Sequence, residues 1–123
     1  MFFLTVEDHF SSAHQLRGYK GKCENLHGHN WKVLLTVKGE ILNEIGLLID
    51  FHDLRKMLKE TLALIDHCNI NETVHFKSTN PSSEELAKFI YLQMESLLEK
   101  EKTVSVKTVT VFESEKCSCS YEK

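Results

Sequence analysis

The chain has 123 residues, of which 41% are hydrophobic and 27% are charged. These proportions are typical of one soluble globular domain, and they exclude a disordered chain and two independent cores, so we expect a single domain over residues 1–123. Fifteen Lys and Arg against 18 Asp and Glu give a formal net charge of −3, which argues against a nucleic-acid backbone as the main partner.

The apolar opening MFFLTV is followed at once by Glu7 and Asp8, without a basic leader or a small-residue cleavage site. It therefore does not resemble a signal peptide, and no apolar run approaches the roughly 18 residues of a membrane span. We expect a cytoplasmic protein without a membrane partner. In a reducing cytosol the four cysteines indicate metal binding, catalysis or core packing rather than disulfides.

The first half of the chain predicts two strands and a helix. Apolar residues of one parity over 2–14 are typical of a strand, a charged loop follows at 17–25, and a second strand is expected over 27–38. Asp50 is the predicted N-cap of a helix. Its apolar residues recur every three or four positions: Phe51, Leu54, Leu58, Leu62 and Ile65.

The second half predicts a helix followed by a hairpin. After a polar connection over 66–80, Ser82 and Glu85 have the spacing of a capping box for a helix that extends to about Lys100. A β-branched strand is expected over 104–112, with its return over 113–121. The order strand-strand-helix-helix-strand-strand indicates an α+β fold, an antiparallel four-stranded sheet with two helices on one face.

Such a layout leaves one face and two edges of the sheet uncovered. Leu34 lies on the opposite face of its strand from Val33 and Leu35, which places bulky apolar groups on both faces. We therefore expect the subunits to associate into a homo-oligomer.

The sharpest motif is His27-Gly28-His29. Residues i and i+2 of a strand point to the same side, so the two imidazoles can bind one cation. We expect His14, at the end of the first strand, to lie beside them if the two strands pair. Three neutral imidazoles with an open fourth position are typical of a catalytic zinc site, whereas isolated histidines are more often ordinary polar or core residues.

Three other residues or pairs carry chemistry in this sequence. Cys23, four residues before His27, is either a fourth zinc ligand or a base held next to the metal, and the spacing does not decide between the two. Asp66-His67 is either a proton-transfer pair or a polar helix end. Glu113 shares parity with the apolar residues of its strand. Either it binds a ring with two adjacent N–H donors, as in a pterin or guanine edge, or the strand has reached solvent there.

Taken together, these residues resemble the 6-pyruvoyltetrahydropterin synthase / 6-carboxytetrahydropterin synthase family. The matching segments occur in family order over nearly the whole chain. They are Phe10-Ser11-Ser12-Ala13-His14, Cys23-x3-His27-Gly28-His29, Gly46-Leu47-Leu48-Ile49-Asp50-Phe51, Asp66-His67 with Asn69, Asn80-Pro81-Ser82-Ser83-Glu84, and Val111-Phe112-Glu113-Ser114.

The resemblance implies the tunnelling fold, in which trimers or hexamers close their sheets into a barrel with active sites at subunit interfaces. It implies Zn²⁺ as the cofactor and 7,8-dihydroneopterin triphosphate as the substrate. By position, the resemblance assigns three roles: His14, His27 and His29 as zinc ligands; Cys23, Asp66 and His67 as catalytic residues; and Glu113 as the pterin anchor. Arg17, Lys20 and Lys22 are the local candidates for binding the triphosphate.

The short chain resembles the bacterial enzyme of queuosine and deazapurine synthesis more than the enzyme of tetrahydrobiopterin synthesis. Glu24 beside Cys23 leaves open side-chain cleavage toward 6-hydroxymethyldihydropterin, although an exposed loop glutamate is the simpler interpretation. A non-enzymatic zinc module, closed by Cys23 and the three histidines, is the alternative from another class of protein. Cys68, Cys117 and Cys119 are expected to be structural or incidental.

Overall fold

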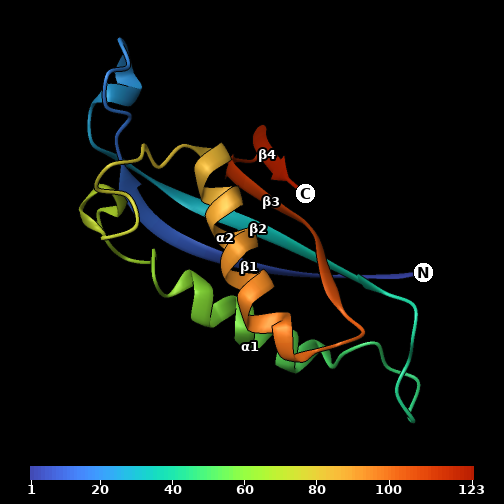
Figure 1. Cartoon of the computed structure of the whole chain (residues 1–123). Coiled ribbons are helices and arrows are strands. Elements are labelled where there is room, and N and C mark those ends of the chain that lie inside the picture. Colours follow the sequence, from blue (N-terminus) through green and yellow to red (C-terminus); the bar gives the residue numbers. More distant parts are fainter.

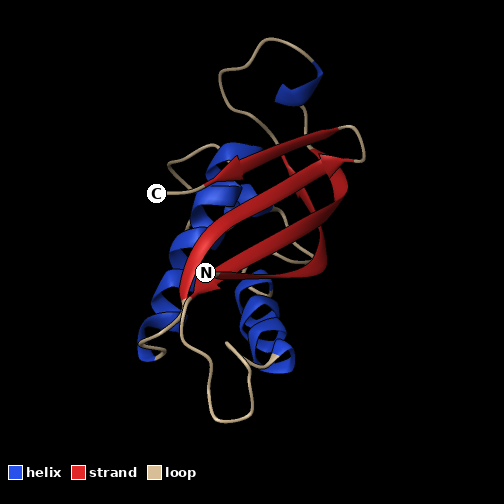
Figure 2. Cartoon of the chain, turned by 90° about the vertical axis from the view of Figure 1, so that its right-hand side faces the viewer, coloured by secondary structure: helices blue, strands red, loops and turns tan.

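The computed structural model describes residues 1–123, except for the side chain of Cys23. Its sheet has four antiparallel strands in the order β1-β2-β3-β4, and two helices lie against one face (Figures 1 and 2). The strands are β1 (Phe2–His14), β2 (His27–Gly39), β3 (Ser105–Ser114) and β4 (Cys117–Tyr121), the helices are α1 (Phe51–Leu62) and α2 (Ser83–Leu97), and short 3-10 turns are η1 (Lys22–Glu24), η2 (Ile70–Glu72) and η3 (Leu98–Lys100). The predicted α+β layout is confirmed.

Both predicted helix starts are capped as expected. The Asp50 carboxylate accepts a hydrogen bond from the His52 amide at 2.6 Å, and the Ser82 hydroxyl accepts one from the Glu85 amide at 3.2 Å. The predicted apolar stripe extends beyond the end of helix α1. Its last residue, Ile65, is buried in the turn that follows the helix. In the described part of the chain, neither helix combines the length and the apolarity that crossing a bilayer requires.

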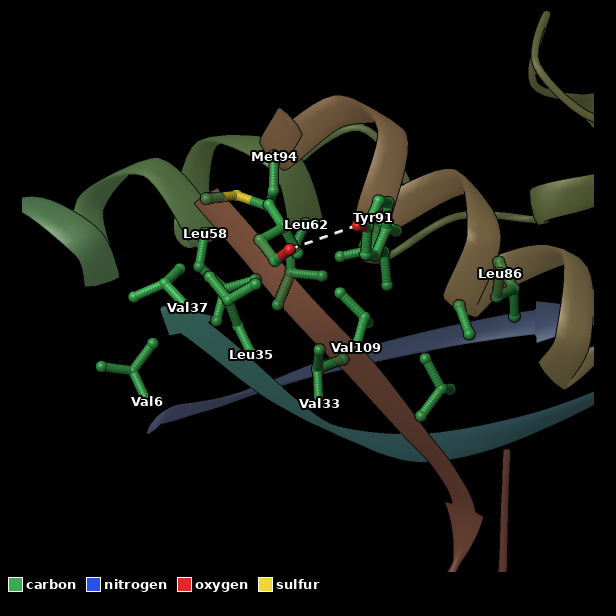
Figure 3. Packing of buried hydrophobic residues seen from close by; sticks show 14 of the residues in the cluster. Val6, Val33, Leu35, Val37, Leu58, Leu62, Leu86, Tyr91, Met94 and Val109 are labelled. Atoms are coloured by element: carbon green, nitrogen blue, oxygen red, sulfur yellow. Dashed lines mark hydrogen bonds between the residues drawn. The ribbon is translucent and has the colours of Figure 1, made fainter. Parts of the chain in front are cut away.

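The core fills the space between the helices and the facing side of the sheet. Figure 3 shows Val33, Leu35 and Val37 of β2 pointing toward α1 and α2, where they meet Leu58 and Met94. All five side chains are fully buried. Each such side chain contributes about 1.5–3 kcal/mol relative to an exposed one, so this layer holds the sheet in place under the candidate site.

The opposite face of the sheet is largely polar. Thr5 and Thr36 share a hydrogen bond of 2.8 Å across β1 and β2, and the ammonium group of Lys32 lies 4.2 Å from the centre of the Phe112 ring. Leu34, which predicted an apolar patch there, is half-buried among these polar neighbours. Closure of a barrel by several copies stays a prediction, since a single chain does not test it.

Candidate metal centre and active site

Strand pairing brings the three predicted imidazoles together. His14 ends β1 and lies directly opposite His27, which begins β2. Their Nε2 atoms are 3.1 Å apart. Glu113 adds a carboxylate from the end of β3, with its Oε1 at 2.8 Å from Nε2 of His29 and 3.8 Å from Nε2 of His14. One ligand atom from each of the four residues lies within 4.8 Å of all the others.

The outer nitrogens of two imidazoles are fixed by backbone carbonyls. Nδ1 of His14 donates to the carbonyl of Pro81 at 2.7 Å, and Nδ1 of His27 donates to that of Asn25 at 2.7 Å. A carbonyl oxygen only accepts, so Nδ1 carries the proton in each neutral ring and Nε2 presents a lone pair. Two lone pairs therefore face each other across 3.1 Å.

Burial keeps two of these rings neutral. Desolvation lowers the pKa of His14, with the nearby His27 adding to the effect and the Pro81 hydrogen bond and Glu113 opposing it. Desolvation likewise lowers the pKa of His29 despite the opposing charge of Glu113. The buried Nε2 of His29 has Oε1 of Glu113 as its neighbour at 2.8 Å.

A cation at the centre of this group satisfies every one of these atoms. In tetrahedral zinc sites the bonds to nitrogen and oxygen are about 2.0–2.2 Å, which places ligand atoms about 3.3–3.5 Å apart. The contacts of 2.8, 3.1 and 3.8 Å bracket that separation. Neutral imidazoles backed by carbonyls, together with one carboxylate, are a donor set that suits zinc.

Trp31 forms the floor of the cluster. Its fully buried ring lies edge-on to His14 at 4.9 Å and to His29 at 5.0 Å, and it stacks on Phe10 at 5.5 Å. The indole N–H donates to the carbonyl of Ser12 at 3.3 Å. A rigid aromatic layer thus supports the imidazoles from the core side.

Asp66 and His67 are fastened to the free edge of β1. The amide of Ser11 donates to the Asp66 carboxylate at 2.9 Å, and the amide of His67 donates to the carbonyl of Ser11 at 2.7 Å. Asp66 also lies 2.7 Å from Nδ1 of His67, whose side chain is 81% exposed. The two side chains are therefore in contact, but they are not part of the four-residue metal group, and their role in proton transfer stays a prediction.

His67 adopts a left-handed backbone conformation, with φ of 51°. For a residue other than glycine this costs about 1–2 kcal/mol, and such strain clusters at functional sites. The sequence contained no signal for it. The two hydrogen bonds to Ser11 hold the backbone in this conformation.

The remaining predicted residues are Cys23 and three cations of the loop between β1 and β2. Cys23 lies in η1, but its side chain is outside the described part of the structure, so its role stays a prediction. The Arg17 guanidinium, a candidate for binding triphosphate, donates to backbone carbonyls of η2 and of the loop after it. Its role toward triphosphate stays a prediction. Lys20 and Lys22 are exposed.

Sequence reasoning missed several groups that support the site. They are the carbonyls of Asn25 and Pro81, and the hydroxyl of Ser83, which donates to Oε2 of Glu113 at 3.3 Å. Backbone carbonyls leave no trace in residue type. The Asn80-Pro81-Ser82-Ser83 segment was noted only as part of the family resemblance.

The chain is similar to proteins of known family. The family model described as "6-pyruvoyl tetrahydropterin synthase" matches residues 3–123. The chain belongs to that family. It is 34% identical over 110 residues to a protein of Archaeoglobus fulgidus named "Putative 6-carboxy-5,6,7,8-tetrahydropterin synthase", with 89% of this chain and 86% of the relative covered.

Two further comparisons cover the whole chain. A Haemophilus influenzae protein named "6-carboxy-5,6,7,8-tetrahydropterin synthase" is 27% identical over 148 residues, with 100% of both chains covered. The solved structure of Caenorhabditis elegans 6-pyruvoyl tetrahydropterin synthase superimposes with a TM-score of 0.85 at 28% identity, covering 100% of this chain and 97% of the other. The fold expected from the resemblance is thereby confirmed for the single chain.

Proposed function

We propose that the protein is a zinc-dependent lyase of queuosine or deazapurine synthesis. It converts 7,8-dihydroneopterin triphosphate and water into 6-carboxy-5,6,7,8-tetrahydropterin, acetaldehyde and triphosphate. Family membership and the 6-carboxy names of two relatives support this reaction. The observation that carries the proposal is the convergence of three imidazoles and one carboxylate, whose ligand atoms all lie within 4.8 Å of one another.

The metal is held by His14, His27 and His29 in this proposal. When bound, zinc acts as a Lewis acid toward the hydroxyl oxygens of the substrate side chain. The carbonyls of Pro81 and Asn25 keep two of the rings in the tautomer that ligation requires. A shallow pocket of about 280 Å³ is lined by Ser11, Ser12, Gly28, His29 and Asn30.

Proton transfer is assigned to Cys23 and His67. The Cys23 thiolate removes the proton from the side-chain carbon next to the ring, and His67 exchanges the second proton. Asp66 supports this role because its carboxylate lies 2.7 Å from Nδ1 of His67, which leaves Nε2 for the substrate. Water addition and cleavage of a carbon–carbon bond then release acetaldehyde.

Glu113 anchors the pterin ring in this proposal. Its carboxylate accepts two charge-assisted hydrogen bonds from adjacent ring N–H groups, which keeps the reacting carbons in register with the proton-transfer groups. The hydroxyl of Ser83 holds one carboxylate oxygen at 3.3 Å and so limits its rotation.

The working unit is a cytoplasmic homo-oligomer, a trimer or hexamer with active sites between subunits. Two features of the chain favour this assembly. Strands β1 and β4 are the edges of the sheet, and His67 is 81% exposed beside the β1 edge. A catalytic imidazole exposed to this degree needs a neighbouring surface to exclude water from its substrate.

Identification of the products tests the proposal. The zinc-loaded protein is incubated with 7,8-dihydroneopterin triphosphate, and products are identified by mass spectrometry, with His27→Ala as the metal-free control. We expect 6-carboxytetrahydropterin and acetaldehyde from the wild type only. A 6-pyruvoyl product, favoured by the name of the Caenorhabditis elegans structure, or a 6-hydroxymethyl product would reject the proposed branch.

Cys23→Ala separates catalysis from a purely structural zinc module. A catalytic Cys23 predicts that this variant retains zinc and loses turnover. Loss of zinc together with altered folding would instead identify Cys23 as a closing ligand of a non-enzymatic module.

A further inference from the structure

Glu113 faces the histidines beside an irregularity in the sheet. The β3–β4 register shifts between Phe112 and Ser114, so Glu113 lies at a β-bulge, where Ser114 pairs with Cys117. Bulges redirect a side chain and often lie next to active sites. Here the carboxylate of Glu113 is half-buried and reaches two of the three imidazoles.

The contact between Glu113 and His29 joins a carboxylate oxygen to a buried ring nitrogen, with Oε1 and Nε2 at 2.8 Å. The same Oε1 also lies 3.8 Å from Nε2 of His14, so one carboxylate oxygen faces two imidazole nitrogens at once. Two electron-pair donors at this distance are held together when both bind the same cation.

We propose that Glu113 is the fourth ligand of the metal in the substrate-free protein and leaves it when a pterin binds. The exchange, though not the ligation, rests on the function proposed above. The same two carboxylate oxygens of Glu113 would bind the metal in the free protein and the pterin ring in the complex. Ring N–H donors of a pterin compete for them, and departure of the carboxylate opens a coordination position for a substrate hydroxyl oxygen.

This arrangement gives the site a closed resting state. Three neutral imidazoles and one carboxylate leave Zn²⁺ with a single net positive charge and a complete tetrahedral shell. The shell opens only when a ligand satisfies Glu113, so recognition of the pterin ring and access to the metal become one event. Ser83 holds Oε2 at 3.3 Å, which leaves Oε1 free to bind the metal.

Cobalt substitution tests the ligation directly. Co²⁺ is added to the metal-free full-length protein, and the visible d–d spectrum is recorded for the wild type, for Glu113→Gln and for the control Glu115→Gln, which alters an exposed carboxylate two residues away. We expect Glu113→Gln alone to change the spectrum. We also expect it to weaken zinc binding by at least about tenfold, which is the smallest typical loss when a group that supports a metal ligand is removed. Unchanged spectrum and affinity in Glu113→Gln overturn the ligation.

A thiolate ligand is the competing explanation. If Cys23 occupies the fourth position, the wild type shows an intense near-ultraviolet sulfur-to-cobalt charge-transfer band that disappears in Cys23→Ala. That result overturns the proposal. Absence of the band, together with a spectrum of Cys23→Ala equal to that of the wild type, supports ligation by Glu113.

Neopterin, which lacks the triphosphate leaving group, tests the exchange. Adding it to the cobalt-loaded wild type is expected to shift the d–d spectrum, and this measurement needs no variant to fold. The same addition to Glu113→Gln is expected to leave the spectrum nearly unchanged. No shift in the wild type at saturating neopterin overturns the exchange. A failed product assay with these spectra intact would reject the proposed reaction and leave the ligation standing.

Discussion

Replacing Asn80 with alanine should weaken metal binding without unfolding the protein. The Asn80 amide makes two hydrogen bonds with the backbone of Arg17, accepting from its N–H and donating to its carbonyl, each at 2.9 Å. The next residue, Pro81, carries the carbonyl that accepts from Nδ1 of His14 at 2.7 Å. Since Arg17 is three residues after His14, these bonds close a ring around the imidazole and fix its direction.

The two effects of the substitution differ in size. The Asn80 hydrogen bonds lie at the surface, where water replaces them, so their loss costs about 1 kcal/mol of unfolding free energy in total. Loss of outer support for a metal-binding imidazole typically costs about 10–100-fold in affinity, or about 1.4–2.7 kcal/mol. The effect on zinc should therefore exceed the effect on stability.

Asn43→Ala is the matched control. The Asn43 side chain accepts two hydrogen bonds, from the amides of Ile45 and Leu47 at 3.0 Å each, in the loop beyond the far end of β2. Urea unfolding of the metal-free proteins should show similar losses for both variants, and chelator competition should show weaker zinc binding in Asn80→Ala alone. Equal zinc affinities in the two variants would refute the positioning role of Asn80.

Three further predictions follow from backbone and thiol geometry. His67→Val should lower the unfolding free energy by about 1–2 kcal/mol in thermal melts whereas His67→Asn should not, because asparagine tolerates the left-handed conformation; equal stabilities would show that the strain is absent. Gly39→Ala should cost about 1–3 kcal/mol, since a Cβ there meets a carbonyl oxygen at 2.3 Å, and Gly28→Ala, with its nearest atom at 3.7 Å, should melt like the wild type. Iodoacetamide should label exposed Cys117 faster than Cys119 in peptide mapping, because burial, assisted by a nearby carboxylate, raises the pKa of the Cys119 thiol; faster labelling of Cys119 would contradict this.

The strands and the histidine group were predictable because both depend on periodicity. Alternation over 2–14 and 27–38 gave the strand positions, and antiparallel pairing through one loop then required His14 to meet His27. The parity of Glu113 with Val109 and Val111 likewise predicted the face that it occupies. Strand periodicity and antiparallel pairing are therefore sufficient to predict those side chains whose positions are set by the sheet.

The supporting contacts were not predictable, because they join residues far apart in the chain through groups that every residue possesses. The carbonyl of Pro81 lies 67 residues from His14. The β-bulge at Glu113 and the left-handed backbone of His67 depend on tertiary context as well. The contacts of Arg17 with the backbone carbonyls of Asn71 and Phe76 were not predictable either, and its candidacy as a triphosphate ligand stays a prediction.

The position of Asp66 and His67 bears on whether two subunits share the proposed active site. His14, at the end of β1, faces the core, whereas the segment around His67 binds the free edge of that strand, at Ser11 and Ala13. That segment covers the end of the edge, so the rest of the β1 edge remains free for a second copy. A seam formed there would end beside His67.

Mixing two inactive variants tests whether the site is shared between subunits. His67→Asn and Cys23→Ala chains are unfolded together, refolded as mixed oligomers, and assayed against each variant refolded alone. Suppose that one chain supplies Cys23 and its neighbour supplies His67. A site is then intact when its Cys23 comes from a His67→Asn chain and its His67 comes from a Cys23→Ala chain, and random association gives this combination in about a quarter of the sites. A site contained in one chain regenerates none, and activity at background in the mixture would place both residues on the same subunit.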